Sequence, residues 1–460
     1  MTANLKQQGP KGLRCYDRVR FLQAFRNCWL TALASFALAG CGQSKDAPAL
    51  PGPSAQELSK AAKSERPLGP AVVQSGQGAT QDSLRLYELK MPPKNLAALE
   101  FTAYSKTTQP ATFIFNGVGY ENVQVRFRGQ WARTWPKKPL KIFFNSGQPF
   151  EGRHCLNLNS GWRDPAFVRE ALAYRVYDAC GVPAPKSRMV RLDLNGQFRG
   201  LYVEVEQPDK AFLHREKLKG ATLFKAISPS NRADERDLGR EESFKIHYDL
   251  ETQKSEGLGE LQSFCHDLAR TTNVLEFFTQ RVDLDKYINY LAASVLVQHW
   301  DGFNKNHFLL YDGRNSKKWW VVPWDLDRTF GDHWAGGFDE ARLPILLGTR
   351  QLPGTTGWNR LADRFFSEPA LRSRFLKRLG QLLEEQFTTE KLFPIVDSLE
   401  SQIGAEAARD RQRWPSPTPD LHSGIAQLKN YIKRRRTFLL REVARELAKL
   451  GEDRAAAGTP

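Results

Sequence analysis

Residues 299–327 read HWDGFNKNHFLLYDGRNSKKWWVVPWDLD, with acidic and amide residues at the outer ends of two apolar segments. Asp301 and Asn306 precede the first segment, and Asp325 follows the second. Two strands of this length form a hairpin whose open ends meet, so these three side chains are expected to converge. An all-oxygen set of this kind suits Mg²⁺ or Mn²⁺ and does not suit Zn²⁺. His307 fits a packing role as well as a ligand role.

The spacing of these residues parallels the catalytic parts of protein kinases. There, an Asp accepts the proton of the substrate hydroxyl, an Asn five positions later holds a metal ion, and an Asp after a later strand holds both metals. Asp301 and Asn306 have that spacing, and the run from Asp325 to Asp327 stands where the DFG motif would be. Each of these two patterns also occurs in proteins where such residues only cap turns. The prediction of a kinase-like site therefore depends on finding the patterns together and in the kinase order.

Upstream residues supply further kinase parts in the same order. Residues 128–135 form a turn that would cover the phosphates, although no GxGxxG pattern is present. Basic residues in and after this turn are candidates for nucleotide contact, and which lysine meets the phosphates stays open: Arg128, Lys137, Lys138 and Lys141. After a later strand, Glu206 and Gln207 fit the position of a hinge between two lobes.

Local signals predict an α+β fold in which strands come first and helices follow. Alternating apolar residues around Asn-Gly turns predict hairpins over residues 111–129 and 188–206, and residues 139–144 read as a further strand. Asp164-Pro165 predicts a helix start, because Asp caps helices and Pro suits the first turn. This helix should end near Cys180-Gly181.

The sequence pattern of the second half of the chain predicts mostly helical structure. A helix should begin near Pro208-Asp209, a late hairpin should occupy residues 308–327, and residues 358–450 carry Leu and Phe at helical intervals. We therefore predict a bilobal fold, with a β-rich N-terminal lobe over about 82–207 and a helix-rich C-terminal lobe over about 208–450. Residues 451–460 are expected to be a disordered tail.

The composition excludes several classes of protein. With 41% hydrophobic and 11% aromatic residues, the chain can build a sizeable core and is not a low-complexity protein. Its net charge of +16 favours anionic partners such as phospholipid, acidic polypeptide or nucleotide phosphates. No zinc finger, RNA recognition motif or arginine-rich arm is visible, so we expect no nucleic-acid partner.

The N-terminus resembles an export signal. Residues 1–40 contain a basic stretch and a short apolar segment that ends Leu-Ala-Gly before Cys41, as in a bacterial lipoprotein signal whose Cys is lipidated. The alternative is a chance Cys after a short buried helix. Residues 41–81 are rich in Ser, Pro, Ala and Gly, as expected for a flexible tether. Cysteines further along the chain have no metal-binding spacing, and we interpret them as buried free thiols.

Over residues 82–444 the chain resembles the spore coat protein H (CotH) kinase family. The resemblance implies an atypical protein-kinase fold that uses ATP and a divalent metal to phosphorylate Ser or Thr of secreted or coat proteins. The segments that carry it are VRFRG, WPKKPLKIFF, DPAFVREALAYRVYDACGVPAP, LDLNGQFRGLYVEVEQPDKAFLHR, VDLDKYINYLAASVLVQHWDGFNKNHFLLYD and VVPWDLDRTFG.

The resemblance also implies roles for individual residues. The family's motif Asp falls on Asp301, its Asn on Asn306, and the two Asp of WDLD on Asp325 and Asp327, which are the expected metal ligands together with Asn306. The basic pair before the strand falls on Lys137 and Lys138, and the VEQ segment on Glu206 and Gln207. Two positions depart from the family pattern, which usually has His at Lys305 and Asn at Glu170.

From these observations we expect an exported, lipid-anchored, ATP- and metal-dependent phosphotransferase of the cell envelope, acting on Ser or Thr of an envelope or coat protein. A non-catalytic scaffold or adhesin with the same fold is an alternative from another class. A nucleotidyl transferase and a glycan kinase are further alternatives, because nothing in the sequence names the acceptor.

Overall fold

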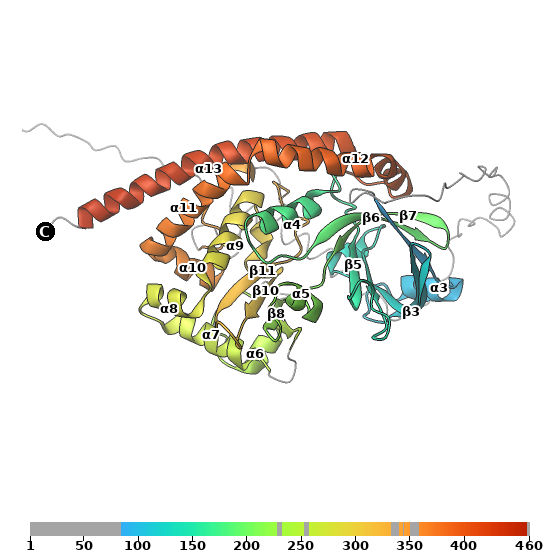
Figure 1. Cartoon of the computed structure of the whole chain (residues 1–460), viewed down its shortest axis with the longest axis horizontal. Coiled ribbons are helices and arrows are strands. Elements are labelled where there is room, and N and C mark those ends of the chain that lie inside the picture. The colour runs from blue at the N-terminus through green and yellow to red at the C-terminus, as the bar shows by residue number, and fades with distance from the viewer. Residues whose placement is uncertain are drawn as a thin grey trace, which may run out of the picture. The chain divides into compact units, whose positions relative to one another are not determined.

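The computed structural model describes residues 84–227, 232–252, 257–332, 340–343, 345–349 and 358–457 (Figure 1). The predicted signal peptide, Cys41 and the predicted tether lie outside the described residues. Within these ranges, no helix combines the length and the apolar character needed to cross a bilayer.

Strands in the first part of the described chain close into a barrel, in the order β1-β2-β3-β4-β5-β7-β6. The contact that closes it is the parallel pairing of β1 with β6, and the other pairs are antiparallel. We call residues 84–207 the barrel lobe. Its elements are β1 (Arg85–Lys90), α3 (Pro93–Phe101), β2 (Gln109–Phe115), β3 (Val118–Phe127), a 3₁₀ turn (Trp131–Thr134), β4 (Leu140–Phe143), β5 (Cys155–Asn159), α4 (Arg169–Ala179), β6 (Ser187–Leu194) and β7 (Gln197–Val205).

The two predicted Asn-Gly hairpins are confirmed. The turn between β2 and β3 has φ 50° at Asn116 and 76° at Gly117, and the turn between β6 and β7 has φ 53° at Asn195 and 76° at Gly196. Positive φ at both central residues is the geometry that matches the twist of antiparallel strands, and Asn and Gly adopt it at low cost. The predicted strand at 139–144 is also confirmed, as β4.

Aromatic rings fill the inside of the barrel. Tyr87, Phe113 and Phe150 are fully buried and meet edge to face, with ring centroids 5.1 to 5.7 Å apart. Such contacts add to the stabilisation that burial of their large apolar area already gives. The barrel lobe therefore has a core of its own, separate from the main core of the molecule.

The predicted start of the first long helix needs a correction. Helix α4 begins at Arg169 and not at Asp164. The Asp164 carboxylate accepts hydrogen bonds from the backbone N–H of Ala166 (3.0 Å) and Arg169 (2.9 Å), and it pairs with the Arg169 guanidinium at 2.6 Å. Phe167 has φ 61°, outside the helical region. Asp164 therefore stabilises a bend before the helix, because its carboxylate accepts hydrogen bonds from backbone N–H groups of residues 166 and 169.

The rest of the chain forms what we call the helical lobe, residues 208–457. Its small sheet has the order β11-β10-β8-β9 and is antiparallel throughout. The predicted late hairpin is confirmed as β10 and β11, whereas β8 and β9 were not predicted. The elements are α5 (Lys210–Arg215), β8 (Thr222–Ala226), α6 (Glu241–Lys245), β9 (Tyr248–Leu250), α7 (Gly259–Arg270), α8 (Val274–Arg281), α9 (Leu284–Val297), β10 (His307–Tyr311), β11 (Trp319–Pro323), α10 (Arg360–Ser367), α11 (Pro369–Glu385), α12 (Thr389–Arg413) and α13 (Leu421–Ala457).

Two further predictions concern helices in this lobe. The helix predicted to begin near Pro208-Asp209 is confirmed as α5, and the Asp209 carboxylate caps it by accepting from the backbone N–H groups of Ala211 and Phe212. The prediction of a mostly helical segment from 358 to 450 is confirmed by α10 to α13. The predicted disordered tail is wrong for residues 451–457, because α13 continues to Ala457.

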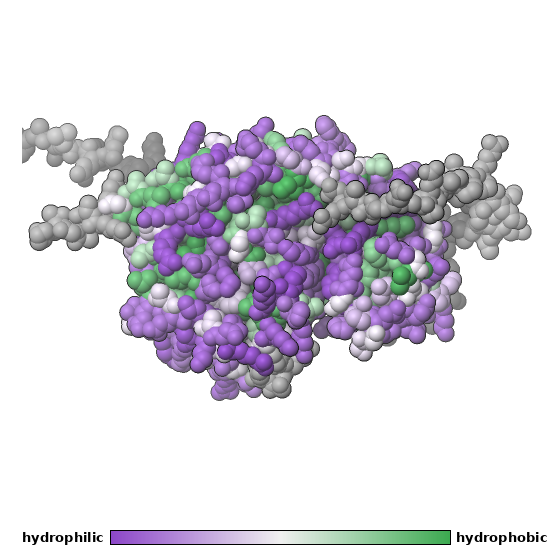
Figure 2. Space-filling view, in the orientation of Figure 1, coloured by the Kyte–Doolittle hydropathy of each residue, from purple (hydrophilic) through white to green (hydrophobic). Residues whose placement is uncertain are grey.

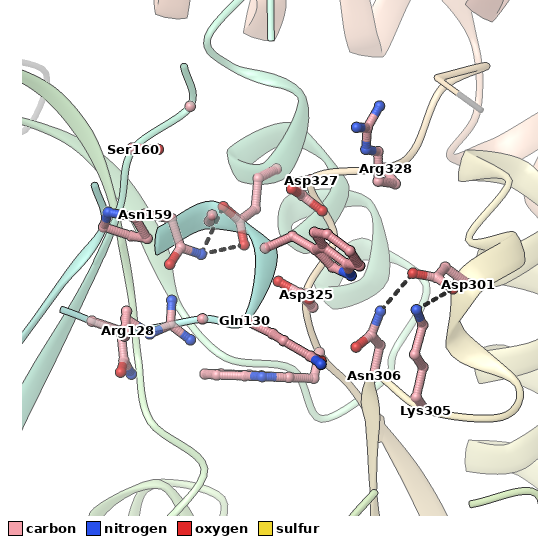
Figure 3. A pocket seen from close by; sticks show the side chains of 18 of the residues that line it. Arg128, Gln130, Asn159, Ser160, Asp301, Lys305, Asn306, Asp325, Asp327 and Arg328 are labelled. Carbon is pink, nitrogen blue, oxygen red and sulfur yellow. Dashed lines mark hydrogen bonds and ion pairs between the residues drawn. The ribbon is translucent and has the colours of Figure 1, made fainter. Parts of the chain in front are cut away.

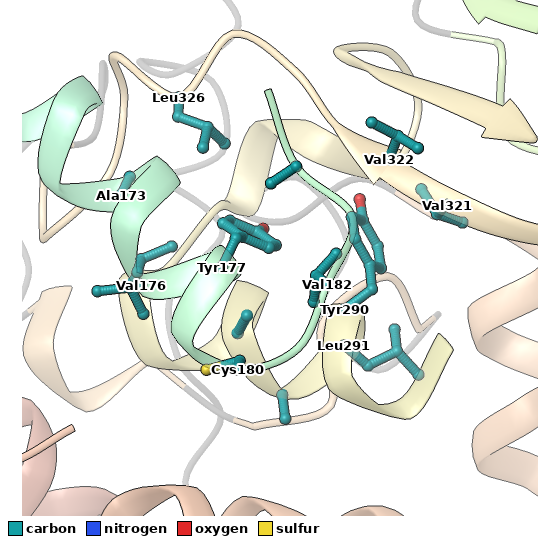
Figure 4. Packing of buried hydrophobic residues seen from close by; sticks show 14 of the residues in the cluster. Ala173, Val176, Tyr177, Cys180, Val182, Tyr290, Leu291, Val321, Val322 and Leu326 are labelled. Carbon is teal, nitrogen blue, oxygen red and sulfur yellow. The ribbon is translucent and has the colours of Figure 1, made fainter. Parts of the chain in front are cut away.

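Helix α4 packs into the helical lobe although it belongs to the barrel lobe in sequence (Figure 4). Tyr177 and Val176 of α4 lie in one buried cluster with Leu291 of α9 and Val321 of β11.

Cys155, Cys180 and Cys265 are buried free thiols, as predicted. The face in Figure 2 is largely hydrophilic, with apolar side chains visible in patches between the helices.

A buried ion pair fixes the barrel to helix α12. Lys137 Nζ lies 2.5 Å from Asp410 Oδ2, and both side chains are fully buried. The same Asp410 oxygen accepts from the backbone N–H of Leu201 at 2.7 Å. A side chain at Gly200 would place its Cβ only 2.6 Å from this oxygen, so the contact requires glycine there. Trp414, just beyond α12, donates to the carbonyl oxygen of Arg199 at 2.6 Å.

Removal of the Asp410 carboxylate should destabilise the protein strongly. Asp410→Ala leaves the Lys137 ammonium buried without its counter-charge, and we expect the free energy of unfolding to fall by about 3–5 kcal/mol. Asp397, on the same helix as Asp410, makes an exposed ion pair with Lys429 of α13. Asp397→Ala should lower the free energy of unfolding by less than about 1 kcal/mol. Urea denaturation of both variants measures the difference. Equal midpoints for the two variants would contradict the role given to this pair.

Candidate active site

A pocket of about 880 Å³ lies between the two lobes (Figure 3). The barrel lobe contributes the loop after β3, strand β4, and the end of β5 with the residues that follow it. The helical lobe contributes β8, the residues before β10, and those after β11. Seven of the predicted site residues line this pocket: Arg128, Lys141, Gln207, Asp301, Asn306, Asp325 and Asp327.

The Asp301 carboxylate is held by two neighbours in its own loop. Asn306 Nδ2 donates to Asp301 Oδ2 at 2.9 Å, and Lys305 Nζ lies 3.2 Å from Asp301 Oδ1. The bond to Asp301 leaves the Asn306 amide oxygen on the side of Asp325 (Figure 3). Burial raises the pKa of Asp301 to about 6, against the opposing effect of the Lys305 charge.

Asp325 follows β11 directly, and the hairpin brings it to Asn306 as predicted. His307 of β10 pairs with Pro323 of β11, and Trp324 donates its backbone N–H to the carbonyl oxygen of Asn306 at 3.2 Å. Asn306 and Asp325 both adopt left-handed backbone conformations, with φ 59° and 60°. These conformations are uncommon for residues other than glycine, and they tend to cluster at functional sites.

Two further carboxylates share this region with Asp325. Burial raises the pKa of Asp327 well above its usual range, and the charges of Asp325 and Glu170 add to the shift. Glu170, in the first turn of α4, has its pKa raised to about 8 by burial and by the charge of Asp325. Asn159 Nδ2 holds both Glu170 oxygens, at 2.7 and 2.9 Å. The site therefore concentrates acidic side chains, and the positive charges of Arg128 and Arg328 oppose the pKa shifts of Glu170 and Asp327 only in part.

This donor set fits a hard divalent cation. In the part of the chain that the structure describes, no three His, Cys, Asp or Glu side chains are grouped closely enough to form a cage by themselves. Asp325, Asp327 and the amide oxygen of Asn306 nevertheless line one wall of the pocket. Mg²⁺ is commonly held by one or two carboxylates, with water and substrate phosphates completing its octahedron. A cation here would also relieve the repulsion that raises the pKa of Asp327.

Of the three candidate lysines, the structure brings only Lys141 to the pocket. Lys141 Nζ donates to Gln207 Oε1 at 2.7 Å, and burial, with repulsion from Arg128 and Lys225, lowers the pKa of Lys141 to about 8. Asn157 Nδ2 donates to the same Gln207 oxygen at 3.2 Å. The Arg128 guanidinium lies 5.4 Å from the centre of the Trp324 ring.

Three predicted nucleotide-binding residues lie outside the pocket, which corrects those predictions. Lys137 is fully buried in its pair with Asp410. Lys138 donates to the carbonyl oxygen of Trp135 at 3.2 Å and lies 3.9 Å from the Glu100 carboxylate. Glu206 pairs with the Arg215 guanidinium at 2.6 Å and accepts from the backbone N–H of Lys186 at 2.9 Å. Each has a structural partner that sequence alone does not reveal.

The two histidines beside the motif have packing roles. His299 is fully buried, lies 3.2 Å from the Tyr177 hydroxyl, and burial lowers its pKa to about 3. His307 Nε2 lies 2.9 Å from Glu235 Oε1 in a buried pair, which settles its role as structural. These contacts fix the start of the Asp301 loop and the start of β10.

Sequence reasoning missed several residues that line the pocket. Glu170, Asn159, Lys225 and Arg328 all contribute polar side chains to it. Asn159 belongs to the run CLNLN, whose alternating amides are a signal for one polar face of a strand. The one sequence signal at Glu170 is its departure from the family pattern, which usually has Asn there. Lys225 has no local signal, because its position depends on the unpredicted strand β8.

Comparison with known proteins identifies the family. A family model described as CotH kinase protein matches residues 125–439. The chain belongs to the CotH kinase family. It is 28% identical to the inner spore coat protein H of Bacillus subtilis, over 70% of this chain and 88% of that protein. It is 25% identical to the invasin CotH2 of Rhizopus delemar, over 49% of this chain and 41% of that protein.

Among solved structures, the chain is similar to the Helicobacter pylori proinflammatory kinase CtkA, with 12% identity and a TM-score of 0.32, over 68% of this chain and 95% of that one. It is also similar to the HipA, HipB and operator DNA complex of Shewanella oneidensis, with 13% identity and a TM-score of 0.31, over 77% and 80% of the two chains. Family membership and the two lobes described above confirm the predicted α+β bilobal fold of the kinase type.

The raised pKa of Glu170 predicts how stability depends on pH. The pKa of Glu170 rises from its ordinary value of 4.5 in the unfolded chain to about 8 in the folded protein, so the folded protein retains this proton between these pH values. Stability from this group is present at low pH and is lost as the pH rises to about 8. Glu170→Gln removes the titration, so in the absence of divalent cations its free energy of unfolding should improve relative to wild type between about pH 5 and about pH 8.

Urea denaturation at several pH values measures this difference, with Glu260→Gln, at an exposed position of α7, as the control. The control curve should run parallel to that of wild type. Parallel curves for Glu170→Gln as well would show that folding does not raise the pKa of Glu170, which would contradict the prediction.

Proposed function

We propose that this chain transfers the γ-phosphoryl group of ATP, with a divalent cation, to a Ser or Thr hydroxyl of an envelope or coat protein. The observation that supports this best is the meeting of Asp301, Asn306 and Asp325 in one pocket, opposite Lys141. Membership of a family described as kinases supports the same reaction class. The pocket, at about 880 Å³, is large enough for a nucleotide.

In the proposed reaction, the acceptor hydroxyl donates its proton to the Asp301 carboxylate as its oxygen bonds to the γ-phosphorus. The bond between that phosphorus and the bridging oxygen of ADP breaks, and ADP leaves with the electron pair. A carboxyl with a pKa of about 6 suits this task, because it is ionised near neutral pH yet is a better base than an ordinary Asp. Lys141 would bind the phosphates and oppose their charge.

The remaining acidic residues would serve a bound cation. Asp325, Asp327 and the amide oxygen of Asn306 would hold it, and the cation would neutralise charge on the transferred group when bound. The chain's own part is to orient these oxygens: the hairpin fixes Asp325 beside Asn306, and the hydrogen bond to Asp301 fixes the Asn306 amide. Loss of either constraint would misplace an oxygen ligand.

The proposed location and acceptor come from the relatives and from the N-terminal sequence. A relative named as an inner spore coat protein supports a coat or envelope acceptor. Export and anchoring through Cys41 rest on the sequence of the N-terminus alone. ATP is scarce outside the cytoplasm, so a spore interior, an imported nucleotide pool or adenylyl transfer would each reconcile export with this site.

A non-catalytic role is the second candidate. Relatives named as invasins support an adhesin-like function, although this chain matches only 41% and 42% of their lengths. A scaffold has no chemical reason to keep three carboxylates and Asn306 in one pocket, where their repulsion costs stability. The pocket therefore favours the phosphotransferase.

Labelled nucleotide separates these candidates. The purified chain is incubated with Mn²⁺ or Mg²⁺ and with ATP labelled at the γ- or the α-phosphate, alone and with a coat or envelope protein fraction. Acid-stable label on protein from γ-labelled ATP only is the expected result. Label from α-labelled ATP would show adenylyl transfer, and no label from either, with no ADP formed, would favour the scaffold.

Loss of the Asp325 carboxylate should abolish turnover and leave the fold intact. The side chain lines the pocket and is not part of the packed core, so Asp325→Ala should melt like wild type. We expect ADP formation to fall by about 10²-fold or more, because the ligand that orients the cation is gone. Asp285→Ala, at an exposed helix position, is the matched control. Persistent turnover in Asp325→Ala would remove this residue from the site.

Asp301 should act on the chemical step and not on nucleotide binding. Asp301→Asn keeps a hydrogen-bond acceptor for Asn306 but cannot take the proton, so kcat should fall by about 10²- to 10⁴-fold with little change in ATP affinity. Kinetics and thermal melting are compared with those of Asp285→Asn. An unchanged kcat would exclude Asp301 as the base, whereas a parallel loss of melting temperature and activity would assign it a structural role.

The N-terminus makes a separate prediction. If the signal is processed as the sequence indicates, the mature protein begins at Cys41 and carries lipid there, since small residues precede the Cys and a polar tether follows. Mass spectrometry of the N-terminal peptide from the protein's own host measures this. An intact peptide across residues 1–60 with unmodified Cys41 would contradict it.

A further inference from the structure

Lys225 is a pocket residue with no role in the account so far. It lies on β8, where it pairs with Phe308 of β10, and its side chain lines the pocket from the helical lobe. Its Nζ lies 5.8 Å from the centre of the Phe308 ring and 5.6 Å from that of Trp324. The lysine therefore lies on the floor of the pocket and does not extend away from the protein.

Among the residues that the structure describes, the charge of Lys225 has no direct partner. In the described part of the chain, its ammonium makes no hydrogen bond or ion pair, and its contacts are with the two aromatic rings. Carboxylates at Glu251, Asp249 and Asp325 act on it only through space. Burial, with repulsion from Arg128, lowers the pKa of Lys225. A lysine without a counter-charge at such a place costs free energy unless an anion binds.

Two cations of the barrel lobe, Arg128 and Lys141, line the same pocket as Lys225. Arg128 and Lys225 both lie over the Trp324 ring, at 5.4 and 5.6 Å from its centre. Lys141 lines the same pocket, and burial together with the charges of Arg128 and Lys225 lowers its pKa. None of the three pairs with a carboxylate among the described side chains, and each comes from a different strand or loop. Together they form an anion site.

The position of this anion site, beside the carboxylates, indicates which chemical group of a ligand would bind there. Trp324, which lies beneath Arg128 and Lys225, directly precedes Asp325 in the chain. An anion bound by these cations therefore lies beside the carboxylates proposed to hold the divalent cation. A polyphosphate chain joins two such sites naturally, because its oxygens bind both a cation and basic side chains.

We propose that Lys225 binds the phosphate chain of ATP from the helical lobe, opposite Lys141 and Arg128 of the barrel lobe. This inference rests on the proposed function and adds a residue to it. Nucleotide binding then spans both lobes, since each lobe supplies cations to the same phosphates. The alternatives are that Lys225 contacts the base or ribose, or that it only packs on Trp324 and Phe308.

Calorimetric titration of the purified full chain with Mg²⁺-ATP and with adenosine tests the proposal. Lys225→Met keeps the length and the ring contacts but removes the charge. The dissociation constant for ATP should rise about tenfold or more, as expected for loss of one charge-assisted hydrogen bond, while that for adenosine stays unchanged. Lys225→Arg should retain most of the ATP affinity. Lys377→Met, at an exposed position of α11, is the matched control and should bind both ligands like wild type.

Each outcome decides between the alternatives. Equal weakening for ATP and adenosine in Lys225→Met would assign the lysine to the nucleoside and overturn the proposal. Unchanged ATP affinity would leave it a packing role only and would also overturn the proposal. Should Lys225→Met fail to fold by thermal melting, Lys225→Gln provides the same comparison. Failure of the wild-type chain to bind ATP would overturn the proposed function itself, which distinguishes that failure from failure of this inference.

Discussion

The repulsion among Glu170, Asp325 and Asp327 is the constraint on which the site depends. Burial is the larger cause of the raised pKa values of Asp327 and Glu170, and the charge of Asp325 adds to both shifts, so the three carboxylates cannot all be ionised cheaply. Asn159 fixes Glu170 with two hydrogen bonds, and the hairpin fixes Asp325. The fold therefore holds these oxygens together at a cost in stability, and a divalent cation is the simplest group that offsets it.

The two lobes contribute to this arrangement in different ways. The helical lobe supplies Asp301, Asn306 and Asp325 from the open end of one hairpin, so their spacing follows from strand pairing. The barrel lobe supplies Lys141 from β4 and Glu170 from α4, and helix α4 is anchored in the core of the other lobe. The buried pair of Lys137 with Asp410 holds the barrel against α12. Rigid attachment of this kind holds the opposite walls of the pocket at a fixed separation and orientation.

The parts of the structure that could be predicted from sequence are those set by local signals. The Asn-Gly hairpins and the Asp301, Asn306 and Asp325 constellation follow from turn chemistry and short spacing, and the structure brings them together as expected. The roles of the lysines could not be predicted. Lys137 and Lys141 are four residues apart and chemically identical, and a partner far along the chain, Asp410, decides which of them is buried. Lys225 could not be predicted either, because its strand β8 pairs with β10, which lies far along the chain.

The most direct test of the central claim is calorimetric titration of Mn²⁺ into the wild-type chain near neutral pH, repeated in two buffers with different heats of ionisation. The account predicts saturable binding with release of protons, because the cation must displace protons from carboxyls whose pKa values are raised. The dependence of the measured heat on the buffer gives the number of protons released. Saturable binding without proton release, or no binding at millimolar Mn²⁺, would contradict the account.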